Sequence, residues 1–267
     1  MTVTRGPLSS QLSADGTLEY TTSGGSDYSA VNQASRTFSK LPAAGDVFAR
    51  GQVIYRVSND PVVLLYGNTP VYRSLYAGDS GPDVREPNRN LVALGYATRH
   101  EVDWDWDYFS EETRYALETF QDKFGVDETG YLAEGQVVFL PGRIRITTVT
   151  ATLGTNAGAG AAILQATSTD RQVVVSLNAA EQSEVEVVDQ VRITLPDGTA
   201  TPGVLSGIGT VASGGSNPML PVYIALRHPR AAGTLDQAPV TVQITTVTVR
   251  NTLIVPIDAL LALSDGG

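Results

Sequence analysis

The amino-acid sequence predicts a mainly β protein that carries a small all-α insertion, and two patterns support this prediction. Short apolar runs rich in Val, Ile and Thr recur over most of the 267 residues, separated by turns that contain Gly or Pro. Between residues 78 and 140 the apolar spacing instead follows the period of a helix. Hydrophobic residues make up 42% of the chain and charged residues 17%, which is typical of a folded protein with a substantial core.

The region before residue 70 is expected to consist of strands and turns. Residues 2–20 predict strands with turns near Gly6 and Gly16, because Gly-Pro and Asp-Gly pairs are turn signals. Residues 38–57 predict three short strands joined by glycine-centred turns, and residues 61–67 predict an apolar strand.

The helical region is expected to contain two main helices and one short helical turn. Residues 84–96 place their apolar side chains on one face, and Gly95 is a natural stop. Residues 113–125 show helical spacing again, with Ser110 as the N-cap. The chain after residue 130 is expected to make a short helical turn and then return to a strand.

The remainder of the chain again predicts strands. From residue 143 onward, apolar strands and turns alternate at short intervals, which is typical of a small barrel or sandwich. One helix-compatible stretch interrupts them at 178–189. The segment 146–167 also resembles the segment 38–57, since both have a strand, a Gly-rich turn and a second apolar strand. We therefore expect one domain made of two halves, with the helical insertion between them and its ends close in space.

The composition excludes several classes of function. The net charge of -10 opposes binding to nucleic-acid phosphates. The absence of Cys and the presence of only two His exclude thiolate chemistry and a His-rich metal site. No paired nucleophile and base are visible, so we expect no catalytic residue, no cofactor and no metal.

The loop Asp103-Trp104-Asp105-Trp106-Asp107 has two further interpretations. Its alternating carboxylates suggest a hard cation and its Trp rings suggest a sugar, but a glycine and a closing Glu needed for a calcium loop are missing. The favoured prediction is that the two Trp rings cap the helical core.

The motifs LPAAGDVFARGQVIYRV (41–57) and ATLGTNAGAGAAILQAT (151–167) resemble the two lipoyl-like halves of periplasmic adaptor (membrane fusion, HlyD-like) proteins of efflux systems. The segment 189–212 resembles the barrel strands of that family, and TLIVPIDALLAL (252–263) resembles its strand near the C-terminus. The resemblance implies a split lipoyl-like (barrel-sandwich hybrid) domain, a β-barrel domain and a membrane-proximal segment. It implies no lipoyl group, because no Lys lies at the corresponding turn and the nearest is Lys40.

The insertion resembles the peptidoglycan-binding domain 1 type, through GDSGPDVREPNRNLVALGY and FSEETRYALETFQDKFGVDETG. This implies a three-helix domain. Pro87 departs from the family, which usually has Leu there, and we place it in the first turn of the helix, where Pro is tolerated. The resemblance yields these candidate peptidoglycan-binding residues: Asp83, Arg85, Asn88, Tyr96 and Gln121. A structural role is the alternative for each of them.

The predicted domains follow from these segments. They are N-terminal strands at 1–30, a first lipoyl-like half at 31–70, a helical domain at 71–141, a second lipoyl-like half at 142–170, a β-barrel at 171–248 and the start of a membrane-proximal segment at 249–267.

The resemblance implies a non-enzymatic adaptor in the cell envelope, of the actinobacterial type. Its expected partners are an inner-membrane transporter of the ABC or RND type, peptidoglycan, and further copies of itself. No apolar run reaches the roughly 20 residues of a membrane span, so the expected anchor is an N-terminal segment outside this chain. Two alternatives stay open: a wall-binding targeting protein or hydrolase accessory without a transporter, and a helical module that serves only as a spacer.

Overall fold

The computed structural model describes residues 4–22, 26–70, 72–213, 217–233 and 235–254. The chain forms two compact units. One combines the residues up to Tyr20 with those from Asp170 onward, and the other spans Thr21–Thr169. Within the described residues, no helix has the length and apolar character that a membrane crossing requires.

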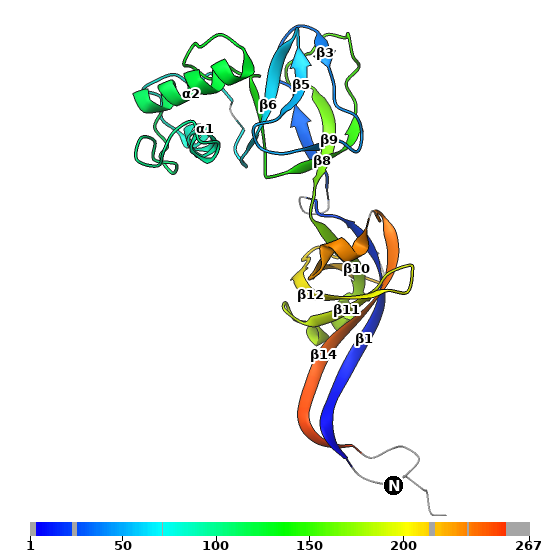
Figure 1. Cartoon of the computed structure of the whole chain (residues 1–267). Coiled ribbons are helices and arrows are strands. Elements are labelled where there is room, and N and C mark those ends of the chain that lie inside the picture. The colour runs from blue at the N-terminus through cyan, green and yellow to red at the C-terminus, as the bar shows by residue number, and fades with distance from the viewer. Residues whose placement is uncertain (1–3, 23–25, 71, 214–216, 234, 255–267) are drawn as a thin grey trace, which may run out of the picture. The chain divides into compact units, whose positions relative to one another are not determined.

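The first unit is a closed β-barrel. Its strands follow the order β1-β10-β13-β12-β11-β14 (Figure 1). Inward side chains alternate with outward ones along β10, where Val173, Val175 and Leu177 are buried and belong to the barrel core. The strands are β1 (Thr4–Tyr20), β10 (Arg171–Asn178), β11 (Gln190–Thr194), β12 (Ala200–Ile208), β13 (Met219–Leu226) and β14 (Ala238–Ile254). Two 3-10 helices, η1 (Ala179–Glu184) and η2 (Pro229–Ala232), join the barrel strands.

The turns predicted near Gly6 and Gly16 are wrong, because β1 is one continuous strand of 17 residues. The register of β1 against β14 shifts after Gly6, so this glycine marks a bulge and not a turn. Gly16 pairs with both β10 and β14, and a Cβ there would lie 2.9 Å from Val173 Cγ1 and 3.0 Å from Val174 O. Crowding between neighbouring strands therefore accounts for Gly16.

The second unit contains two four-stranded sheets and the helical module (Figure 1). One sheet has the order β2-β9-β8-β4 and the other the order β3-β5-β6-β7. The strands are β2 (Tyr28–Val31), β3 (Phe38–Lys40), β4 (Val47–Phe48), β5 (Val53–Val57), β6 (Asp60–Tyr66), β7 (Val137–Leu140), β8 (Ile144–Val149) and β9 (Ala162–Ser168).

The two sequence halves on either side of the helical module fold together. Strand β4 of the first half pairs with β8 of the second, and β2 pairs with β9. Buried side chains from both halves share one core, among them Phe38, Ile54, Ile146 and Leu164. This association was predicted from the likeness of the two segments, and the fold class is confirmed. The C-terminal motif at 252–263 lies outside the described residues from 255 onward.

Buried Asn32 ties the two halves together through polar contacts. Its Nδ2 donates to Ala34 O at 2.7 Å and to Gly158 O at 3.2 Å, and its Oδ1 accepts from the Tyr55 hydroxyl at 3.1 Å. The side chain of Asn32 has no exposed area, and burial raises the pKa of the Tyr55 phenol above its usual range. Loss of such a satisfied buried amide leaves its partners without hydrogen bonds. Nothing in the sequence singled out this residue.

Strand β6 separates two cores. Its residues Val62 and Leu64 face the core shared by the two halves, whereas Val63 and Leu65 face a second core built with the helices. All four are buried. This two-sided burial explains why the strand is an unbroken apolar run and not an alternating one.

The helical module is the crossover between two parallel strands. Strand β6 pairs in parallel with β7, and the chain between them contains α1 (Pro82–Ala93) and α2 (Glu111–Phe124) (Figure 1). Parallel neighbours need a long connection, which usually contains a helix. The ends of the insertion are therefore adjacent because they are neighbouring strands of one sheet.

The helix ends follow the predicted signals. The Ser110 hydroxyl accepts from Thr113 N at 3.2 Å, and Gly125 ends α2 in the left-handed conformation. Helix α1 begins earlier than predicted, with Pro82 near its start. Pro87 is consequently an interior residue of α1, so its predicted place in the first turn is wrong. The predicted short helical turn is a hydrogen-bonded turn, in which Gln136 N donates to Ala133 O at 3.2 Å.

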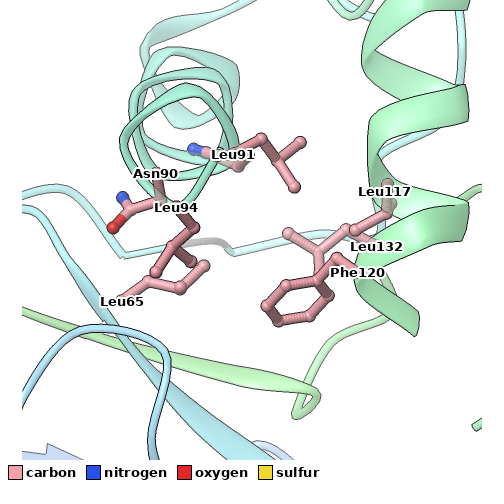
Figure 2. A pocket seen from close by; sticks show the side chains of 8 residues that line it. Leu65, Asn90, Leu91, Leu94, Leu117, Phe120 and Leu132 are labelled. Carbon is pink, nitrogen blue, oxygen red and sulfur yellow. The ribbon is translucent and has the colours of Figure 1, made fainter. Parts of the chain in front are cut away.

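Figure 2 shows how α1, α2 and β6 meet: Leu65 lies next to Leu94, the C-cap residue of α1, and Leu91 of α1 points toward Leu117 and Phe120 of α2. A void of about 10 Å³ remains between them. That volume holds about one water molecule, so the void is a packing defect and not a ligand site. Its lining is the point where the sheet and both helices share one core.

The shared strand predicts that the helical module and the sheet lose stability together. We expect Leu65→Ala to lower the free energy of unfolding of the second unit by about 3 kcal/mol, because it leaves a cavity on the helical side of β6. Leu153→Ala is the matched control, since Leu153 is 61% exposed, and should change it by less than about 0.5 kcal/mol. Urea unfolding followed by circular dichroism measures both. Equal effects of the two variants would contradict this account of β6.

Candidate functional site

Asp83 is fully buried at the start of α1 and is held by an arginine. Arg73 Nε donates to its Oδ2 at 2.8 Å, and Arg73 Nη2 donates to its Oδ1 at 3.2 Å. The same Nη2 donates to Ser80 O at 2.9 Å. The hydrogen bond to Asp83 is the main reason that the pKa of Arg73 is raised. Asp83 thus fixes the chain that leads into the helix.

Asn88 is also fully buried, and all of its hydrogen bonds lie inside the module. Its Nδ2 donates to Trp106 O at 3.2 Å and to Tyr108 O at 3.0 Å. Its Oδ1 accepts from the Thr113 hydroxyl at 2.9 Å. The side chain therefore links α1 to the loop before α2 and to α2 itself.

Gln121 makes the same kind of link at the other end of α2. Its Nε2 donates to Thr129 Oγ1 at 3.1 Å and to Tyr131 O at 3.0 Å, and its Oε1 accepts from Gly130 N at 3.0 Å. Its exposed fraction is 1%. Gln121 contacts a different loop from Asn88, so the structure does not bring these two candidates to a common site.

Tyr96 forms part of the wall of a shallow hollow. Its ring meets Phe120 edge-on with the ring centres 5.6 Å apart, and burial raises the pKa of its phenol. The hollow has a volume of about 180 Å³ and is lined also by Glu101, Glu112 and Tyr115. Tyr96 thus contributes both to the core and to the surface.

Arg85 is the most exposed of the five candidates, with 42% of its side chain accessible. Its Nε lies 3.9 Å from Asp105 Oδ1, so it sits beside the loop that Asn88 holds. Peptidoglycan binding by the five candidates stays a prediction, and the geometry gives Asp83, Asn88 and Gln121 structural contacts.

The prediction that Trp104 and Trp106 cap the helical core is wrong. Their exposed fractions are 40% and 55%, and neither belongs to the helical core. Phe109, which is fully buried, fills the core where this loop enters α2. The chain makes a turn at Trp104 and Asp105, closed by the hydrogen bond from Trp106 N to Asp103 O, and residues 103–108 are all exposed. Sequence reasoning also missed Arg89 and Arg99, which lie over the Trp104 ring.

A groove of about 730 Å³ lies between the loop after α2 and the turn that joins β5 to β6. Its walls include the charged residues Arg36, Asp60, Asp127 and Glu134. Gly135 borders it, and a Cβ at that position would lie 2.5 Å from Ala34 N, so only glycine permits this close approach. The walls come from segments that are distant in sequence, which is why no motif indicated the groove.

The side-chain chemistry of the described part of the chain gives no metal centre. Across the resolved ranges, no three His, Asp or Glu residues converge as ion ligands do. The turn at 43–46 that corresponds to a lipoyl attachment turn is closed by Asp46, whose carboxylate accepts from Ala43 N at 2.8 Å. The described chain thus comprises a barrel, a split β domain and a helical module that connects two strands of one sheet.

Comparisons with known proteins agree with this architecture. Residues 80–134 match the model of the putative peptidoglycan binding domain. Comparison with curated protein sequences gives no match. Among solved structures, MacA from Actinobacillus actinomycetemcomitans is similar over 98% of this chain and 86% of its own, with a TM-score of 0.54 and 14% identity.

Two other solved structures are similar at lower scores. ZneB from Cupriavidus metallidurans covers 90% of this chain and 100% of its own, with 12% identity and a TM-score of 0.46. The membrane fusion protein Spr0693 from Streptococcus pneumoniae R6 covers 88% and 99%, with 13% identity and a TM-score of 0.46. The likeness to MacA shows a shared fold, and residues 80–134 match the model of a putative peptidoglycan binding domain.

The contacts of Asn88 and Arg85 predict that replacing Asn88 costs much more stability than replacing Arg85. Asn88→Ala should lower the free energy of unfolding by about 2 kcal/mol, because it leaves buried groups of the loop and α2 without partners. Arg85→Ala should change it by less than about 0.5 kcal/mol, because its pairing is long and exposed. Thermal and urea unfolding of both variants check this. A neutral Asn88→Ala would refute the structural role given to this side chain.

Proposed function

We propose that this chain is the extracytoplasmic adaptor subunit of a membrane export system, and that its helical module contacts peptidoglycan. The observation that carries the proposal is the likeness to MacA over nearly the whole chain, combined with the match of residues 80–134 to a peptidoglycan-binding model. Fold alone does not define function, so the argument rests also on what the surfaces offer.

The proposed mechanism is binding and geometry, without bond chemistry. Two observations support it: the sequence has no Cys and only two His, and the described residues hold no cluster of metal-ligating side chains. The groove next to Gln121 contains carboxylates, but no His or Cys is among the described residues that line it. The chain is accordingly proposed to act as a connector.

The module is well suited to hold a fixed position on the β domain. Asn90 of α1 accepts from Tyr66 N at 2.8 Å and donates to Tyr66 O at 2.7 Å, so α1 is bonded to the backbone of β6. Leu65 on the same strand packs into the helical core. A surface on the module is therefore presented at a defined place on the sheet, as a contact between a transporter assembly and the cell wall requires.

The proposed partners are an inner-membrane transporter of the ABC or RND type and further copies of the chain. An N-terminal segment outside this chain is proposed to hold it at the outer side of the cytoplasmic membrane. The barrel unit offers the β surface for the transporter, and the helical module faces the wall. The alternative is that the module serves only as a spacer. The internal hydrogen bonds of Asp83, Asn88 and Gln121 favour a structural role for these three residues, and they do not bear on the rest of the module.

Co-purification tests the adaptor role. The full-length protein, tagged and expressed in its own cells, should recover an ABC or RND transporter subunit after extraction in mild detergent. The control is an unrelated tagged envelope protein with the same kind of anchor, which should not recover the transporter. Repeated recovery of the chain without any transporter would contradict the proposal, and measurable lysis of purified peptidoglycan would contradict its non-enzymatic part.

A further inference from the structure

Both tryptophans of this chain lie in one loop, and both are exposed. The sequence contains two Trp, at positions 104 and 106, and their exposed fractions are 40% and 55%. Tyr108 follows at 43% and meets Trp106 edge-on, with the ring centres 6.4 Å apart. Large aromatic side chains gathered on a surface without a packing role mark an interaction site. We refer to Trp104, Trp106 and Tyr108 as the aromatic platform.

The backbone that carries the aromatic platform is fixed. Buried Asn88 donates to the carbonyls of Trp106 and Tyr108, and Asp107 O accepts from Gly81 N at 2.7 Å. Within the loop, Trp106 N donates to Asp103 O at 3.1 Å. The rings are thus presented by a loop that is anchored to α1 and to its N-terminal turn. A surface ordered before binding avoids much of the entropic cost of association.

Charged groups of both signs surround the rings. The guanidinium carbons of Arg89 and Arg99 lie 5.2 and 5.4 Å from the centre of the Trp104 ring. Arg89 Nη2 also lies 2.5 Å from Asp105 Oδ1. Arg85 Nε has no hydrogen-bond partner and is 3.9 Å from that same carboxylate oxygen. Within the described residues no cation lies over the Trp106 ring, and Trp106 is the more exposed of the two.

We propose that the aromatic platform binds the glycan strand of peptidoglycan, with a sugar ring stacked on Trp106. The flat apolar face of a pyranose ring suits an aromatic face, and its hydroxyl and acetamido groups need donors and acceptors at the rim. Arg85, Arg89 and Asp105 supply such groups. This inference rests on the proposed function, and it adds that the module recognises the sugar chain and not the stem peptide.

The local charge argues against a nucleic acid or an anionic lipid surface as the ligand of these exposed aromatic side chains. Asp103, Asp105 and Asp107 alternate with the two Trp in the sequence, and the whole chain has a net charge of -10. A nucleic acid or an anionic lipid surface calls for an excess of positive charge at this place. An uncharged, hydroxyl-rich polymer tolerates the mixture of Arg and Asp, because both can hydrogen-bond to it.

Intrinsic fluorescence tests the proposal directly, because both tryptophans of the protein lie on the aromatic platform. The probes are a β-1,4-linked hexamer of N-acetylglucosamine and peptide-free glycan strands prepared from peptidoglycan with an amidase. Both should cause a saturable fluorescence change in the full chain, and calorimetry should give the same affinity. Trp106→Ala should weaken binding about tenfold, whereas Trp106→Tyr should retain most of it.

Tyr72→Ala is the matched control, because Tyr72 is an aromatic residue that is 61% exposed and lies outside the aromatic platform. It should bind the glycan as the wild type does. Trp106 contributes nothing to the core, so the Ala variant should keep its circular dichroism spectrum and melting temperature. Equal affinities of wild type, Trp106→Ala and Tyr72→Ala would overturn the proposal. Binding of isolated stem peptides or of anionic vesicles, with no response to either glycan, would also overturn it.

Sedimentation with purified cell walls separates this inference from the proposed function. If the wild type sediments with walls and Trp106→Ala sediments less, both the proposed wall contact and the glycan-binding role of the aromatic platform are supported. Equal sedimentation of the wild type and Trp106→Ala would overturn the glycan-binding role of the aromatic platform, while wall binding by the protein would still be supported. Failure of the wild type to sediment with walls would overturn both wall contact and glycan recognition.

Discussion

The two-sided burial of β6 is the constraint on which the second unit depends. Leu64 fills the core that the two sequence halves share, and Leu65 fills the core that the helices share. Because neighbouring residues of a strand point to opposite faces, a shift of one residue would exchange the two sets. The parallel pairing with β7 fixes this register at the strand where the helical module returns. The helical module is therefore the crossover connection between β6 and β7, and not a separate domain on a linker.

Buried polar side chains also hold the parts of the second unit together. Asn32 joins the two halves of the split domain, Asn90 bonds α1 to the backbone of Tyr66, and Asn88 holds the loop between the helices. Each is buried, so each hydrogen bond is made away from competing water, and its loss leaves an unsatisfied partner. Of these amides, Asn88 also bonds the exposed loop that bears the two tryptophans to α1. A buried contact of the core thus holds the backbone of the proposed glycan-binding loop.

Periodicity and turn chemistry were enough to predict the fold class, the helices near 84–96 and 113–125, and the union of the two similar halves. They could not distinguish a glycine in a turn from a glycine forced by crowding, and Gly16 was misjudged for that reason. The interior position of Pro87 was missed because Pro82 already occupies the helix start. The site was less predictable, because a motif gives residue types and does not say whether a side chain faces the core or the solvent. Asp83, Asn88 and Gln121 were therefore named as candidates although they are buried, and the exposure of the two Trp was not recognised.

Native-state hydrogen exchange tests most directly whether the module and the sheet form one body. If β6 couples them, the slowest amides of α1 and α2 and those of β6 should open with the same free energy and respond alike to low concentrations of denaturant. Exchange of the helical amides through a lower-energy opening, with the β6 amides still protected, would show that the module unfolds alone and would contradict the central claim.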